Sequence, residues 1–307
     1  MPNVISTASL SETQRRQLAV LTRPPRLAIP TASLWLGQTL VVICDDTLAL
    51  LGHLPLGLAM LINTLVLYAG FSVVHDSIHR AISRNHRVND WLGRLAIVLF
   101  TPYVSLGLFR WAHSLHHRYT GGPKDPDKEM QGPWWQLPFR WMFLDVVYLV
   151  HVLRNPDPIS RRCLRDSAKL AVLTAGVLLA LLYAGYGLPL LLLWFVPSRI
   201  IFLLLGFTFF WLPHLPHDTE QADNFTRATT VRLGHEWLLS PLLQYQNFHL
   251  MHHLYPTTPF FNNAKVWHLL EAELRQHDLA IQHGFALMPT IYPGHRGAEQ
   301  AKLSSGG

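Results

Sequence analysis

Long apolar stretches alternate with polar, basic segments along this chain. Four of them approach the roughly 20 residues that a helix needs to cross a bilayer. They run over about 34–51, 54–74, 170–186 and 188–212. The first is the weakest, because Asp45 and Asp46 interrupt it. We expect an all-α integral membrane protein with four spanning helices in two hairpins, joined by tight turns near 52–55 and 185–189.

The positions of Lys and Arg give the expected orientation. Neither tight turn contains Lys or Arg. The segments that flank the hairpins carry Arg80, Arg84, Arg110, Arg118, Arg161, Arg162, Arg165 and Lys169. Because basic loops stay in the cytoplasm, both turns are predicted outside, and both termini and the long middle segment inside.

Two more apolar stretches, 91–109 and 141–153, are rich in Trp, Tyr and Phe. We interpret them as interfacial or re-entrant helices, because an extra crossing there would separate histidines that are expected to work together. Arg199, midway along the fourth stretch, should face the protein interior or a cavity. An ion pair with Asp45 or Asp46 and a role along a substrate path are both compatible with that position.

The chain ends differ from the apolar middle. Residues 1–30 are polar and basic without a signal-peptide pattern, so we expect a cytoplasmic N-terminal segment. Residues 31–293 are predicted to form one membrane domain. Residues 294–307 are rich in Gly and Ser and are expected to be disordered.

Composition supports the membrane interpretation. Only 14% of the 307 residues are charged, against about 25% in soluble domains. The net charge is +6, but no basic cluster typical of nucleic-acid binding occurs. The two cysteines, Cys44 and Cys163, form no CxxC motif, so neither a disulfide framework nor a thiolate metal site is expected.

Ten of the 18 histidines fall in four short groups. The groups are HDSIH at 75–79, HSLHH at 113–117, HLPHD at 214–218 and HLMHH at 249–253. A spacing of three or four residues puts side chains on one helical face, so each group can offer two ligands to a metal. Imidazole is a poor lipid-facing group and a good metal ligand. Nine or ten imidazoles exceed the four ligands of structural zinc and suit two iron ions.

Other metal chemistry fits less well. The chain has no HExxH motif of zinc proteases and no Glu-x-x-His pair of carboxylate di-iron bundles. Haem ligation would usually need histidines inside the apolar stretches, and a metal transporter would spread ligands along a path across the membrane. Structural roles are expected for the remaining histidines, which are His53, His86, His151, His235, His268, His277, His283 and His295.

HDSIH, HSLHH and HLMHH resemble the three histidine boxes of the integral-membrane fatty acid desaturase and hydroxylase superfamily, over about residues 60–270. The resemblance implies four spanning helices, a cytoplasmic histidine-rich cap, two non-haem iron ions and O2-dependent attack on unactivated C–H bonds. Positions that match the family's ligands are His75, His79, His113, His116, His117, His214, His249, His252 and His253. His217 is an additional candidate ranked behind His214.

The stretches FWLPHLP at 210–216 and QNFHL at 246–250 further resemble the β-carotene ring hydroxylases of this superfamily. KDPD at 124–127, followed by GPWW at 132–135, also fits them. DPD and HHLYP occur in acyl-lipid desaturases too. The resemblance favours carotenoid-ring hydroxylation, with fatty-acyl desaturation as the alternative and ketone formation or oxidative decarboxylation behind.

Groups beside the ligands should accept the remaining imidazole N–H. The candidates are Asp76, Asp125, Asp127, Asp218 and Asn247. Asp125 and Asp127 could instead build a turn around Pro126. The chain has no fused haem domain and no Gly-rich dinucleotide motif, so a separate electron donor such as a ferredoxin is expected, attracted by the basic loops.

Overall fold

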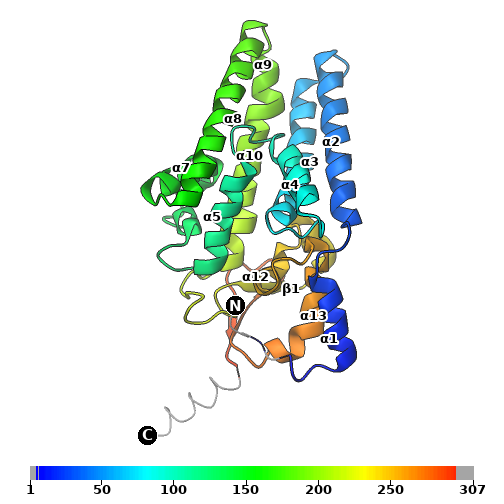
Figure 1. The fold of residues 1–307 in the computed structure, drawn as a ribbon, viewed down its shortest axis with the longest axis vertical. Helices are drawn as coiled ribbons and strands as arrows, with labels where there is room; N and C mark the ends of the chain where they lie inside the picture. The colour runs from blue at the N-terminus through cyan, green and yellow to red at the C-terminus, as the bar shows by residue number, and fades with distance from the viewer. Residues whose placement is uncertain (1–4, 6, 295–307) are drawn as a thin grey trace. The chain divides into compact units, whose positions relative to one another are not determined.

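The computed structural model describes residue 5 and residues 7–294, and most of them are helical (Figure 1). Contacts divide the chain into two compact units. The helical unit comprises residues 24–114 and 129–207. The mixed unit comprises the chain up to Arg23, Leu115–Lys128 and the chain from Thr208 onward. Both units therefore combine segments that are distant in sequence.

Four helices are long and apolar enough to cross a membrane, as predicted. They are α2 (Ile29–Leu50), α3 (Leu56–Ile78), α8 (Pro158–Tyr183) and a run from Gly187 to His214. That run comprises α9 (Gly187–Leu190), η2 (Leu191–Phe195), α10 (Val196–Leu205), η3 (Gly206–Trp211) and η4 (Leu212–His214). The segments η2 and η3 are π-helical, and Pro197 lies at the start of α10. The protein is thus an all-α membrane protein with four candidate spans.

The third span begins at Pro158 rather than near residue 170. Its first turns carry Arg161 and Arg162, so hydropathy alone misses them. Asp157 caps the helix by accepting hydrogen bonds from the backbone N–H of Ile159 and Ser160. The capped polar turns extend the apolar helix by more than two turns toward its N-terminus.

The α2–α3 hairpin is held in register by buried polar groups, and its helices lie side by side (Figure 1). Asn63 Nδ2 donates to Asp46 Oδ1 at 2.8 Å. A hydrogen bond of this kind holds helices together where lipid offers no other partner. Further along, the Gln38 carboxamide fills the space over Gly70 that a Cβ would occupy.

Arg199 faces the interior of the helical unit, as predicted, but the predicted partners were wrong. Its guanidinium binds both carboxylate oxygens of Asp145 at 3.0 Å and donates to the Tyr103 hydroxyl at 2.9 Å. It also lies 4.7 Å from the Phe202 ring centroid. Asp46 is bonded to Asn63 instead. The partner therefore comes from the 141–153 stretch and ties that stretch to α10.

Neither of the apolar stretches 91–109 and 141–153 forms a single helix long enough to cross a bilayer. The first is divided between α4 (His86–Ile97) and α5 (Leu106–Tyr119), with non-helical residues between them. The second is divided between α6 (Leu137–Met142) and α7 (Leu144–Arg154). Each piece is shorter than a bilayer crossing requires, and their interfacial location stays a prediction.

The mixed unit combines short helices with a small sheet that the sequence did not predict. Its remaining elements are α1 (Glu12–Thr22), η1 (Pro126–Met130), β1 (Thr230–Leu233), α11 (Glu236–Leu242), η5 (Gln246–Phe248), α12 (His249–Leu254), η6 (Phe260–Asn262), α13 (Asn263–Leu274), β2 (Leu279–His283) and β3 (Thr290–Tyr292). β1 pairs parallel with β2, with Val231 opposite Ile281, and β2 pairs antiparallel with β3. The predicted disordered tail lies outside the described residues except for Gly294.

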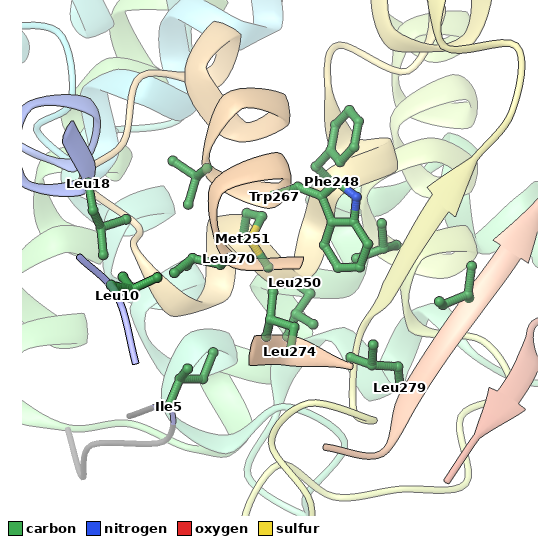
Figure 2. Packing of buried hydrophobic residues seen from close by; sticks show 13 residues of the cluster. Ile5, Leu10, Leu18, Phe248, Leu250, Met251, Trp267, Leu270, Leu274 and Leu279 are labelled. Carbon is green, nitrogen blue, oxygen red and sulfur yellow. The ribbon is translucent and has the colours of Figure 1, made fainter. Parts of the chain in front are cut away.

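One apolar core fixes the position of α12 in the mixed unit. Leu250 and Met251 of α12 are fully buried with Trp267 and Leu270 of α13, and Leu18 of α1 belongs to the same cluster. Figure 2 shows these side chains packed in the interior of the unit. The histidines of HLMHH thus lie on a helix whose apolar residues pack in this core.

Candidate metal centre

In the mixed unit, four histidines bring their Nε2 atoms together. They are His116 on α5, His214 at the end of η4, and His249 and His253 on α12. The His253 Nε2 atom lies 3.3 Å from that of His116 and 3.0 Å from that of His249. The His249 and His214 Nε2 atoms are 3.1 Å apart. All four residues are buried, and their candidate ligand atoms lie within 4.8 Å of one another.

A pair of histidines lies beside this four-histidine cluster. The Nε2 atoms of His117 and His252 are 2.8 Å apart. The His117 ring stacks on that of His253, with centroids 4.2 Å apart. The HxxHH spacing explains the division, because residues three and four apart share one helical face and adjacent histidines diverge. His116 and His253 therefore face the four-histidine cluster, and their neighbours His117 and His252 form the pair beside it.

The helical unit holds a cluster of three histidines. His75 lies in the last turn of α3, His79 is its C-terminal cap, and His113 lies on α5. Their ring centroids are 4.8 to 5.1 Å apart in all three pairs. His75 and His113 are buried. All nine histidines predicted as ligands therefore lie in tight groups with other predicted ligands.

Two carboxylates contact the His116 ring at Nδ1, on the side away from the cluster. Its Nδ1 atom lies 3.0 Å from Asp125 Oδ1 and 3.1 Å from Asp127 Oδ2. Asp125 also accepts hydrogen bonds from the backbone N–H of Gly121 and Asp127. Burial disfavours the charged imidazole, but Asp127 and Asp125 raise the pKa of His116 to about 9. With Nδ1 held by the carboxylates, Nε2 is the ring nitrogen of His116 that faces the cluster.

The imidazoles of His249 and His253 are contacted by uncharged groups. Gln246 Oε1 lies 2.6 Å from His249 Nδ1, and the Thr120 hydroxyl lies 3.4 Å from His253 Nδ1. The sequence interpretation missed both residues, although each lies three or four positions from a predicted ligand. Burial, followed by neighbouring histidines, lowers the pKa of His253 well below its usual value. Neutral imidazole is the form that binds metal.

The remaining candidates have other partners. Asp76 accepts a hydrogen bond from Thr31 at 2.9 Å, and Asn247 donates to Ser240 at 3.1 Å. Asp218 forms a half-exposed ion pair with Arg227. His217 lies against Trp211, with ring centroids 5.8 Å apart, and burial lowers its pKa to about 4. It belongs to neither histidine cluster among the described residues.

The donor set fits iron. Every predicted ligand is an imidazole, which suits zinc, copper, iron and nickel, while thiolate ligands are absent from the described groups. The clusters together offer more imidazoles than one tetrahedral ion takes. His116, His249 and His253 each have a partner at Nδ1 and turn Nε2 toward the cluster, as is usual for metal-bound histidine. The residues present therefore agree with two ions of higher coordination number.

Comparisons with known proteins agree with this chemistry. The model of the fatty acid desaturase family matches residues 51–285. The chain is 44% identical over 70 residues to a zeaxanthin 4-ketolase of Chlamydomonas reinhardtii, covering 22% of this chain and 16% of the ketolase. It is 28% identical over 238 residues to the omega-3 fatty acid desaturase fat-1 of Caenorhabditis elegans, covering 67% and 56%. Both matches cover less than two thirds of the relative's own length.

A third relative is a β-carotene ketolase of Paracoccus sp. (strain PC1). It is 25% identical over 198 residues, which cover 62% of this chain and 70% of the ketolase. The names of these relatives include both desaturation and carotenoid oxidation. The comparisons thus support a desaturase-like oxidoreductase. They do not distinguish a fatty-acyl substrate from a carotenoid.

Proposed function

Because the chain belongs to the fatty acid desaturase family, we propose that it is an O2-dependent membrane oxidoreductase that uses two iron ions to attack an unactivated C–H bond of a lipid. The observation that carries this proposal is the buried four-histidine cluster, in which the Nε2 atoms converge. The proposed iron ligands are His75, His79, His113, His116, His117, His214, His249, His252 and His253.

The chain's own residues prepare the site. The core beneath α12 fixes His249, His252 and His253. The carboxylates of Asp125 and Asp127 offset part of the positive charge that bound iron would bring. When bound, the two irons would supply the activation of O2. Burial of the ligands excludes water from the place where the C–H bond must be broken.

The proposed substrate is a carotenoid ring, and the proposed product is the ring alcohol. The LPHLP and QNFHL stretches support this choice, and two relatives are named as carotenoid ketolases. Hydroxylation converts R–H, O2, two electrons and two protons to R–OH and water. A second hydroxylation at the same carbon, followed by loss of water, would give a ketone.

Fatty-acyl desaturation is the second candidate, favoured by the match to the omega-3 desaturase. Desaturation converts a CH2–CH2 unit, O2, two electrons and two protons to an alkene and two molecules of water. We place the site on the cytoplasmic face, where basic segments flank the spans. A separate acidic redox protein, such as a ferredoxin, would deliver the electrons.

Product analysis tests the proposed reaction. The chain is expressed in one host that accumulates β-carotene and in another with a defined fatty-acid pool, each with a suitable electron donor. Lipids are separated by chromatography and identified by mass spectrometry. A His253→Ala variant, which lacks one member of the four-histidine cluster, is the matched control.

We expect a hydroxylated carotenoid with wild type and none with His253→Ala. A ketone at the ring would keep the carotenoid substrate and change the final product. A new double bond in the acyl pool, with unchanged carotenoid, would contradict the carotenoid assignment in favour of desaturation.

A further inference from the structure

Gln246 stands behind one member of the four-histidine cluster. Its Oε1 atom lies 2.6 Å from Nδ1 of His249, and both side chains are almost completely buried. The opposite ring nitrogen of His249, Nε2, lies 3.1 Å from His214 Nε2 and 3.0 Å from His253 Nε2. The amide therefore contacts the one ring nitrogen that faces away from the cluster.

We propose that Gln246 is a positioning residue that sets the tautomer of His249 and directs its Nε2 lone pair to the metal. A neutral imidazole carries one N–H, and the other nitrogen is then the acceptor or ligand. If Oε1 accepts the Nδ1–H, the lone pair is on Nε2, inside the cluster. The inference rests on the proposed metal centre.

The local fold keeps the amide in place. Gln246 begins η5, and its backbone N–H donates to the Leu243 carbonyl oxygen at 2.8 Å. Phe248, two residues later, is buried in the apolar core of the mixed unit. Gln246 and His249 are three positions apart, which is one turn of a 3-10 helix, so their side chains project on the same side. The backbone at Gln246 is thus held by contacts of the fold itself.

The reverse orientation of the amide predicts different chemistry. If the Gln246 NH2 group donated to Nδ1, the imidazole proton would lie on Nε2 and point at His214 and His253. That tautomer cannot bind a metal through Nε2. Gln246 also differs from the Asp125–Asp127 pair behind His116 because it is uncharged, so the two imidazoles would be unequal donors to the same ion.

Cobalt titration of the full-length protein tests the proposal. The metal-free chain in detergent is titrated with Co²⁺ alone, and the ligand-field absorption bands are followed. Wild type is compared with Gln246→Leu, Gln246→Glu, His249→Ala and Ser240→Ala. Ser240 is buried in the same region and bonds Asn247 rather than an imidazole, so Ser240→Ala is the matched control. Thermal unfolding of each variant checks that it is folded.

We expect Gln246→Leu to weaken one of two Co²⁺ equivalents by about 10- to 100-fold and to shift its absorption bands. Gln246→Glu keeps an acceptor oxygen and should bind Co²⁺ at least as tightly as wild type, and Ser240→Ala should match wild type. A loss of binding in Gln246→Glu would overturn the proposal, because only the reverse orientation needs the NH2 group. This variant decides the question even if Gln246→Leu fails to fold.

Two further outcomes separate this inference from the metal centre itself. Wild-type affinity and spectrum in Gln246→Leu, with binding lost in His249→Ala, would overturn the role of Gln246 and leave the metal centre intact. Absence of Co²⁺ binding by wild type would overturn both.

Discussion

Asp125 serves two purposes that the sequence presented as alternatives. Its side chain accepts from the backbone N–H of Asp127, which builds the turn around Pro126. The same carboxylate contacts His116 Nδ1. The turn therefore brings the carboxylate to the imidazole, and the two interpretations describe one arrangement.

Asp125→Asn should weaken iron binding about 10- to 100-fold, because it removes the negative charge behind a ligand. Iron affinity is measured by titration of the metal-free protein. Glu271→Gln, which removes an exposed ion pair with Arg275 in the same unit, should leave iron affinity unchanged. Equal affinity in Asp125→Asn and wild type would contradict the role given to the carboxylate.

At this scale the sequence predicted which histidines gather better than it predicted the side chains that contact them. The histidines are visible because their spacing is unusual and their chemistry is specific. Gln246 and Thr120 were missed because amides and hydroxyls are common and uncharged. Asp218 has the right chemistry and position in sequence, yet it faces an arginine near the surface. Spacing along one helix does not tell which side chains of another segment lie opposite.

At the scale of elements, α12 connects the histidine cluster to the apolar core. One side of this helix carries the histidines, and the other carries Leu250 and Met251 into the core. A helix of six residues is not stable alone. Its position therefore depends on α13 and α1, which complete the core.

Leu250→Ala should lower the free energy of unfolding by about 2–5 kcal/mol, because it leaves a cavity in a fully buried core. Iron affinity should fall with it, since α12 loses its anchor. The measurements are thermal unfolding in detergent and iron titration. Val20→Ala removes a comparable side chain that is 76% exposed on α1 and should change neither. Unchanged stability in Leu250→Ala would show that the core does not hold α12.

The start of α8 gives a prediction that depends on pH. Burial alone would raise the pKa of Asp157, but hydrogen bonds from Ser160, Trp111 and Ile159 lower it below the usual 3.8. A carboxylate with a depressed pKa stabilises the folded state above pH 3.8, and this contribution disappears as the pH falls through the folded-state pKa.

Asp157→Ala should therefore cost about 1–2 kcal/mol at neutral pH by loss of the helix cap. Asp157→Asn should recover most of that loss, because Asn also caps helices. The difference in melting temperature between wild type and Asp157→Asn should shrink in acid. A difference that stays constant between pH 7 and pH 3 would contradict the assigned role.

Element boundaries show where hydropathy is insufficient. The apolar centres of the spans were predicted, and the start of α8 was not, because capping and polar first turns are invisible to an apolar window. The small sheet was missed for a different reason. Its strands have three to five residues, and β1 pairs with β2 some fifty positions later, so no local pattern identifies it.

For the whole molecule, the expected orientation can be tested by labelling. With Cys44 and Cys163 replaced by serine, a single cysteine at His53, in the α2–α3 turn, should react with an impermeant maleimide added outside intact cells. A cysteine at Arg161 should react only after the cells are opened. The reverse labelling pattern would contradict the predicted cytoplasmic site.

Iron content is the most direct test of the central claim, that the histidine clusters bind two non-haem irons. Wild-type protein purified in detergent is analysed for metals by mass spectrometry and for haem by absorption. We predict about two iron atoms per chain, no haem band, and iron lost from His116→Ala and His253→Ala but retained in His277→Ala, whose ring lies outside the clusters among the described residues. Zinc in place of iron, a haem band, or full iron content in the two cluster variants would contradict the account.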